Sequence, residues 1–134
     1  MEVTMSSFTM DTSAYSAFNR GDKRLKAWFN PEIDIIVPSI VIGELRAGFA
    51  AGSKRIENEK LLQRFIDSPN VYVESISDNT TKIYAGVYLS LRNKGKPIGT
   101  NDMWIAAIAL QVDNELLTLD EGFEHIPDLM IASI

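Results

Sequence analysis

The feature that most constrains the fold is an alternation of short apolar runs with longer helix-like segments. Residues 33–37, IDIIV, are rich in β-branched side chains and end at Pro38, which predicts a buried strand. Similar runs predict strands at residues 8–10, 71–76, 116–119 and 130–134. Helices are predicted from Ser39 to the Gly52-Ser53 break, and at residues 53–67, 78–94 and 102–112. This alternation predicts an α/β fold: a mostly parallel sheet of about five strands with helices on both faces.

The length and composition exclude several classes of protein. The 134 residues suit one domain over residues 1–134. No apolar run is long enough to span a membrane, and we expect no secretory signal. The absence of cysteine excludes disulfides, thiolate metal sites and a cysteine nucleophile, and fits a cytoplasmic protein. The single histidine, His125, excludes a multi-histidine zinc site and argues against a Ser-His-Asp triad; we assign it no catalytic role.

Four acidic residues fall where the predicted elements meet one edge of the sheet. Asp11 and Asp120 end predicted strands, and Glu44 lies in the first turns of a helix that follows a strand. Ligands of open α/β sheets bind outside the carboxyl ends of the strands. Asp102 opens the apolar helix, so it reaches the same edge only if residues 94–99 carry the chain back across. We therefore expect these four carboxylates to form one site.

The chemistry of such a site favours a divalent cation. Carboxylates a few Å apart repel one another unless a positive charge compensates them. Mg²⁺ and Mn²⁺ take oxygen ligands, polarise phosphoryl oxygens and activate water, so no nucleophilic side chain is needed. The net charge of −5 argues against a passive nucleic-acid-binding module but is compatible with a metal enzyme.

Each acid also has a purely local explanation. Asp102 can stabilise the positive end of its helix, with Thr100 or Asn101 as the cap. Asp11 can be an ordinary turn residue, and Asp120 can cap a short segment after it. Glu44 is harder to explain locally, because it shares the apolar face of its helix and a buried acid needs a partner.

The acids lie in four blocks that resemble a known family. MDTSAY, VIGELRAG, GTNDMWIAAIA and LLTLDEGF are similar, in order and spacing, to the PIN domain, and in particular to VapC-type toxins of toxin–antitoxin systems. The resemblance implies a ribonuclease dependent on Mg²⁺ or Mn²⁺, with catalytic and metal-binding acids at Asp11, Glu44, Asp102 and Asp120 and a supporting hydroxyl at Thr118. It also implies inhibition by a cognate VapB-type antitoxin, a homodimer, and an RNA substrate such as tRNA or rRNA.

Two departures and three alternatives accompany this resemblance. Asp120 stands where many relatives have Asn, and Gly122-Phe123 stands where many have Asp-Phe. A housekeeping RNA-processing nuclease and a non-catalytic scaffold of the same fold are the alternatives within the family. A haloacid-dehalogenase-like phosphohydrolase fits poorly, because Ser13 stands where a second aspartate is required. Arg46 and Lys96, which flank acidic blocks, are the candidate contacts to RNA phosphates.

Overall fold

The computed structural model describes residues 7–134, and these form an α/β domain around a parallel sheet of four strands. The strands are β1 (Ser7–Met10), β2 (Asp34–Pro38), β3 (Val71–Glu74) and β4 (Glu115–Leu117). Their order across the sheet is β3-β2-β1-β4. The predicted α/β class and the parallel sheet are therefore confirmed. A possible extension of the first strand to Val3 and Met5 lies outside the described residues.

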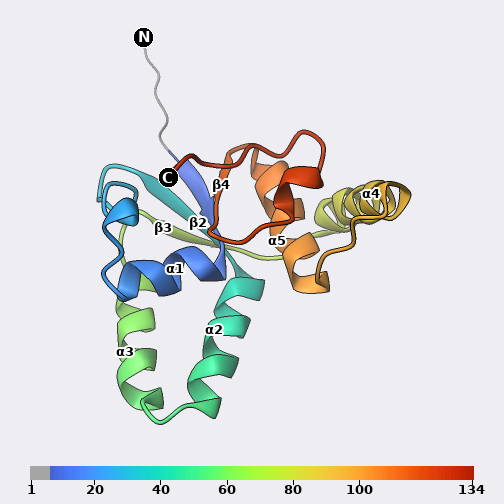
Figure 1. The fold of residues 1–134 in the computed structure, drawn as a ribbon. Helices are drawn as coiled ribbons and strands as arrows, with labels where there is room; N and C mark the ends of the chain where they lie inside the picture. The colour runs from blue at the N-terminus through green and yellow to red at the C-terminus, as the bar shows by residue number, and fades with distance from the viewer. Residues whose placement is uncertain (1–6) are drawn as a thin grey trace.

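Five α-helices pack around this sheet. They are α1 (Thr12–Asn19), α2 (Ser39–Ala51), α3 (Arg55–Ile66), α4 (Asp78–Lys94) and α5 (Thr100–Val112). Figure 1 shows α1, α2 and α3 on one side of the sheet and α4 and α5 on the other. Within residues 7–134, no helix combines the length and the apolar character that crossing a membrane requires.

The central strand and helix α5 make up much of the hydrophobic core. Phe8, Thr9 and Met10 of β1 are fully buried, because neighbouring strands flank β1 and helices cover both faces. Helix α5 is apolar nearly all round, with residues 105–109 fully buried. Such a helix belongs inside a protein. Its burial fixes the position of its first turn, which carries Asp102.

The prediction of about five strands is wrong by one. Residues 130–134 make a single parallel bridge, between Ile131 and Leu116 of β4, instead of a strand. Two backbone hydrogen bonds support it: Leu116 donates to Met130 at 2.8 Å and Ala132 donates to Leu116 at 2.9 Å. Because β4 is only three residues long, it offers the end of the chain little edge with which to pair.

Other element boundaries also differ from the predictions. Helix α1 was not predicted, and α5 begins at Thr100 with Gly99 as its cap, so neither Thr100 nor Asn101 caps it. Ser39 does not cap α2 either, since Pro38 holds that position without a side-chain hydrogen bond. The predicted end of α4 is correct, because Gly95 adopts the left-handed conformation, with φ +66°, that favours glycine.

The strand order creates a switch point between β1 and β4. The chain runs outward from β1 through β2 to β3, then returns to place β4 on the other side of β1. The chain therefore changes direction across the sheet between these two strands. Ligands of open α/β folds bind at this position.

Candidate active site

Asp11 lies at the carboxyl end of β1 and is almost completely buried, with an exposed fraction of 1%. Its backbone N–H donates to the Leu117 carbonyl of β4 at 3.1 Å, which extends the pairing of the two strands by one bond. Its Oδ1 accepts a hydrogen bond of 2.7 Å from the backbone N–H of Thr12, so Asp11 also caps helix α1. The side chain is thus fixed by both the strand and the helix that it joins.

Two hydroxyl groups hold the other oxygen of Asp11. Thr118 Oγ1 donates to Asp11 Oδ2 at 2.6 Å, and Ser13 Oγ donates to it at 3.0 Å. Both hydroxyls in turn accept hydrogen bonds from the segment after β4. The backbone N–H of Asp120 donates to Thr118 Oγ1 and that of Leu119 donates to Ser13 Oγ, each at 3.0 Å. This network places the segment that carries Asp120 against the end of β1.

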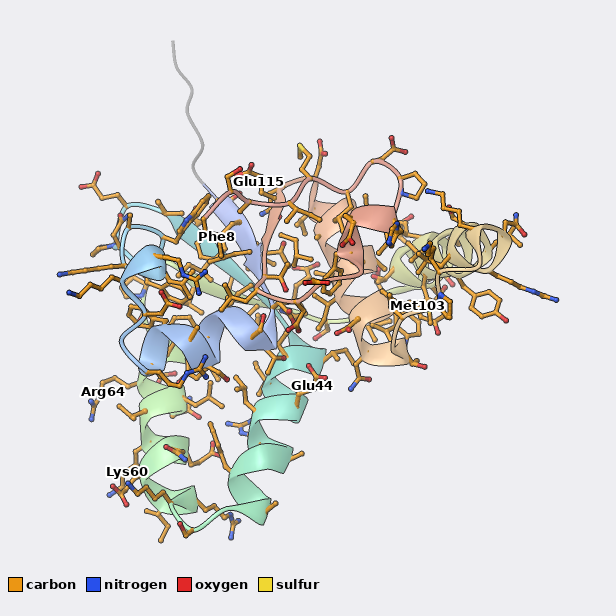
Figure 2. The ribbon with its side chains drawn as sticks, in the orientation of Figure 1. Phe8, Glu44, Lys60, Arg64, Met103 and Glu115 are labelled. Carbon is orange, nitrogen blue, oxygen red and sulfur yellow. The ribbon has the colours of Figure 1, made fainter. Side chains whose placement is uncertain are left out.

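Glu44 is held between two elements that are distant in the sequence. Its Oε1 accepts a hydrogen bond from Thr12 Oγ1 at the start of α1. Its Oε2 accepts one of 3.2 Å from Asn101 Nδ2 in the first turn of α5. Figure 2 shows Glu44 near the beginning of α2, beside the start of α5. The return of the chain through residues 95–99 therefore brings α5 to the carboxyl edge of the sheet.

Asp102 and Asp120 complete a set of four carboxylates that we call the acidic site: Asp11, Glu44, Asp102 and Asp120. Burial raises the pKa of Asp102, and the charges of Asp120 and Glu44 raise it further. Burial also raises the pKa of Asp11, to about 6; its hydrogen bonds from Thr118 and Ser13 oppose this shift, while the charge of Asp120 adds to it. Asp120 itself is exposed.

The chemistry of the acidic site fits a hard divalent cation. Its four side chains offer only carboxylate oxygens. Burial is the main cause of the raised pKa values of Asp11 and Asp102, and the charges of neighbouring acids add to it, as expected where carboxylates lie close together. Among residues 7–134, no Lys or Arg forms an ion pair with any of the four acids. Within the same residues, no three acidic or histidine side chains converge into a ready-made metal cluster. An ion that keeps several water ligands needs only one or two carboxylates.

The two predicted RNA contacts lie in different surroundings. Arg46 points across to α3, where it forms a 2.8 Å ion pair with Glu59 and donates to Gln63 at 3.4 Å. Its guanidinium is therefore engaged away from the acidic site. Lys96 lies in the loop before α5 and lines a groove that Asp102 also lines.

Sequence reasoning did not identify three side chains that position the acids: Thr12, Ser13 and Asn101. Thr12 and Ser13 follow Asp11 directly, and Asn101 directly precedes Asp102, so their nearness to acidic residues was the available signal. Short hydroxyl and amide side chains next to a buried carboxylate are the groups that can satisfy its oxygens.

Comparison with known proteins assigns the chain to a family. It belongs to the PIN domain family, whose model matches residues 9–129. Within that family the chain is similar to ribonucleases named VapC. It is 31% identical over 100 residues to Ribonuclease VapC2 of Rickettsia felis, covering 74% of this chain and 73% of that protein. It is 30% identical over 132 residues to Ribonuclease VapC of Rickettsia bellii, covering 93% and 94%.

A solved structure agrees with this assignment. The chain superposes with a TM-score of 0.81 on a chain of VapBC2 from Rickettsia felis, crystallised with a DNA fragment from the promoter. The two are 25% identical, and the superposition covers 94% of this chain and 97% of that one. The resemblance inferred from the four sequence blocks is therefore confirmed.

The buried Asp11 predicts how stability depends on pH. Its pKa of about 6 in the folded protein exceeds the ordinary 3.8, so the folded state binds the proton more tightly than the unfolded chain. Stability is therefore lost as Asp11 ionises between about pH 4 and 6. In EDTA at pH 7.5, we expect Asp11→Asn to raise the free energy of unfolding by roughly 2 kcal/mol, and by much less at pH 4.

Urea denaturation at the two pH values measures this effect. Asp34→Asn is the matched control, because Asp34 is exposed at the opposite end of the sheet, where β2 begins. Its effect on stability should be small at both pH values. An Asp11→Asn protein that is less stable than wild type by the same amount at both pH values would show that the hydrogen bonds of Asp11 outweigh its desolvation.

Proposed function

We propose that the protein is a metal-dependent endoribonuclease and the toxin of a toxin–antitoxin pair. The observation that carries this proposal is a set of four carboxylates, near enough to shift one another's pKa values, at the switch point of a PIN domain. Similarity to ribonucleases named VapC supports RNA as the substrate. The related VapBC2 complex supports a VapB-type antitoxin as the partner. The homodimer and the choice between tRNA and rRNA stay predictions.

In this proposal, Asp11 and Asp102 would hold an Mg²⁺ or Mn²⁺ ion, and Asp120 would contribute from the exposed side of the site. When bound, the ion would polarise a phosphoryl oxygen and lower the pKa of a water molecule. The raised pKa values of Asp11 and Asp102 favour this role, since a cation would offset the cost of burying these carboxylates as well as the repulsion from their acidic neighbours.

The remaining groups position these acids or act on water. Thr118 and Ser13 donate to Asp11 Oδ2, which leaves the lone pairs of that carboxylate in a fixed direction. Glu44 is oriented by Thr12 and Asn101, and both of its oxygens act as acceptors. It is therefore suited to accept a proton from an attacking water in line with the scissile phosphodiester.

The first experiment is cleavage of total cellular RNA by the purified protein. We expect cutting with Mg²⁺ or Mn²⁺, none with EDTA, and a rate at least about a hundredfold lower for Asp102→Ala. Asp34→Ala should cut like wild type. A folded wild-type protein that cuts no RNA with either metal would contradict the nuclease proposal and favour the non-catalytic scaffold.

Metal binding has a readout that is independent of cleavage. A cation that binds only the folded protein raises its melting temperature, by an amount that grows with the logarithm of its concentration once that concentration exceeds the Kd. We expect millimolar Mn²⁺ to raise the melting temperature of wild type and of Asp34→Asn, and to leave Asp11→Asn and Asp102→Asn almost unchanged. Equal shifts in all four proteins would show that the ion binds elsewhere.

Expression in a bacterial host distinguishes a toxin from a housekeeping nuclease. We expect induction of the wild-type chain to arrest growth, and Asp102→Ala to be tolerated. Co-expression of a small DNA-binding protein encoded beside this chain should restore growth. Normal growth with active wild-type enzyme would instead support the housekeeping alternative.

A further inference from the structure

A groove of about 470 Å³ opens beside Asp102. One wall is the loop of residues 96–99, which leads into α5. The other wall is the turn after β4, with Glu121, Gly122, Glu124 and His125. Its volume is in the range of small-ligand sites. Because Asp102 lines it, whatever occupies this groove lies next to the acidic site.

A hydrogen bond and a close approach hold the two walls of the groove together. Lys94 Nζ, at the end of α4, donates a 2.8 Å hydrogen bond to the carbonyl of His125. Gly122 has φ +108°, and a Cβ added there would lie 3.0 Å from Ile98 Cγ2 on the opposite wall. The two walls therefore approach each other so closely at Gly122 that only glycine fits there. We infer that the groove is formed before any ligand binds.

The charges in the groove favour a nucleobase over a phosphate as its occupant. Asp102, Glu121 and Glu124 all line it and would repel a phosphate. Carboxylates instead accept hydrogen bonds from the amino groups of bases. Glu124 is already engaged: its Oε1 accepts a 2.7 Å hydrogen bond from the N–H of Gly122, and its Oε2 lies 3.4 Å from His125 Nε2. Glu121 is exposed and is the acceptor available to a base.

The two other polar side chains of the groove suit the rest of a nucleotide. His125 is half-exposed and presents a planar ring, and unpaired RNA bases stack on such rings. Lys96 lies on the opposite wall at the approach to α5, where a backbone phosphate entering the acidic site would pass.

Building on the proposed nuclease function, we propose that this groove binds an unstacked base bearing an amino group, next to the scissile phosphate. The base is adenine, cytosine or guanine; His125 stacks on it, Glu121 accepts from its amino group, and Lys96 contacts the adjoining phosphate. Uracil is disfavoured, because it has no amino group and its carbonyl oxygens would face a carboxylate. The groove would thus favour single-stranded RNA and would determine which base lies beside the cleaved phosphodiester.

Binding of short fluorescent oligoribonucleotides in EDTA tests the groove without cleavage. We expect wild type to bind oligo-A and oligo-C about tenfold more tightly than oligo-U. His125→Ala should weaken binding of oligo-A and oligo-C about tenfold, and His125→Phe, which keeps a planar ring, should bind like wild type. Glu121→Gln should lose the preference against oligo-U, because an amide also donates hydrogen bonds.

Two lysine variants, one in the groove and one far from it, test whether Lys96 contacts an RNA phosphate. Lys96→Gln should reduce the slope of log affinity against log salt by about 0.7, the value for one phosphate contact on a single strand. Lys60→Gln removes the same charge from α3, at the far end of the molecule from α4 and α5 (Figure 2), and should leave the slope unchanged. Equal slopes for the two variants would remove Lys96 from the proposal.

Two outcomes separate this inference from the proposed function. Wild-type protein that binds all three oligonucleotides equally, or His125→Ala and Glu121→Gln proteins that bind like wild type, would overturn the groove assignment. Metal-dependent cleavage by the same wild-type protein would still support the nuclease. Sequencing the cut ends gives the second test: Glu121→Gln should admit uracil beside the cut, and an unchanged preference would also overturn the groove assignment.

Discussion

The carboxylate of Asp11, buried where β1 ends, is the group on which the site depends. A buried carboxylate is costly unless its oxygens are satisfied, and here they accept hydrogen bonds from Thr12, Ser13 and Thr118. These donors come from the start of α1 and the end of β4. The hydrogen bonds to this one carboxylate therefore join β1, helix α1 and the end of β4 at one point.

The hydrogen bonds only partly offset the cost of burial, since the pKa of Asp11 remains raised, to about 6. The charge of Asp120 raises the pKa of Asp11 further, and it also raises that of Asp102. The arrangement around Asp11 is thus locally unfavourable for stability. Strain and uncompensated charge of this kind are typical of functional sites, where a ligand supplies what the fold lacks. The groove beside Asp102 has a different character, because Lys96 and the ring of His125 line it together with the acids.

Much of the fold was predictable from local patterns. The IDIIV run gave β2 to within a residue, and the glycine at position 95 gave the end of α4, because both signals act over a few residues. The predicted last strand failed because its formation depends on the length of its partner, β4. Arg46 shows the same limit in the site. Its position two residues after Glu44 suggested a contact to RNA, but α3 brings Glu59, thirteen residues further along the chain, into an ion pair with it.

The sequence by itself determined the class of fold, the family and the identity of the acids, since these follow from apolar spacing and from four short blocks. Only the tertiary structure decided that the acids come near enough to influence one another's charges, that Thr12 and Asn101 orient Glu44, and that a groove lies beside Asp102. The reason is physical. Hydrogen bonds, desolvation and charge repulsion depend on distances between atoms, and residues separated by 32 or 57 positions have no fixed distance until the core has packed.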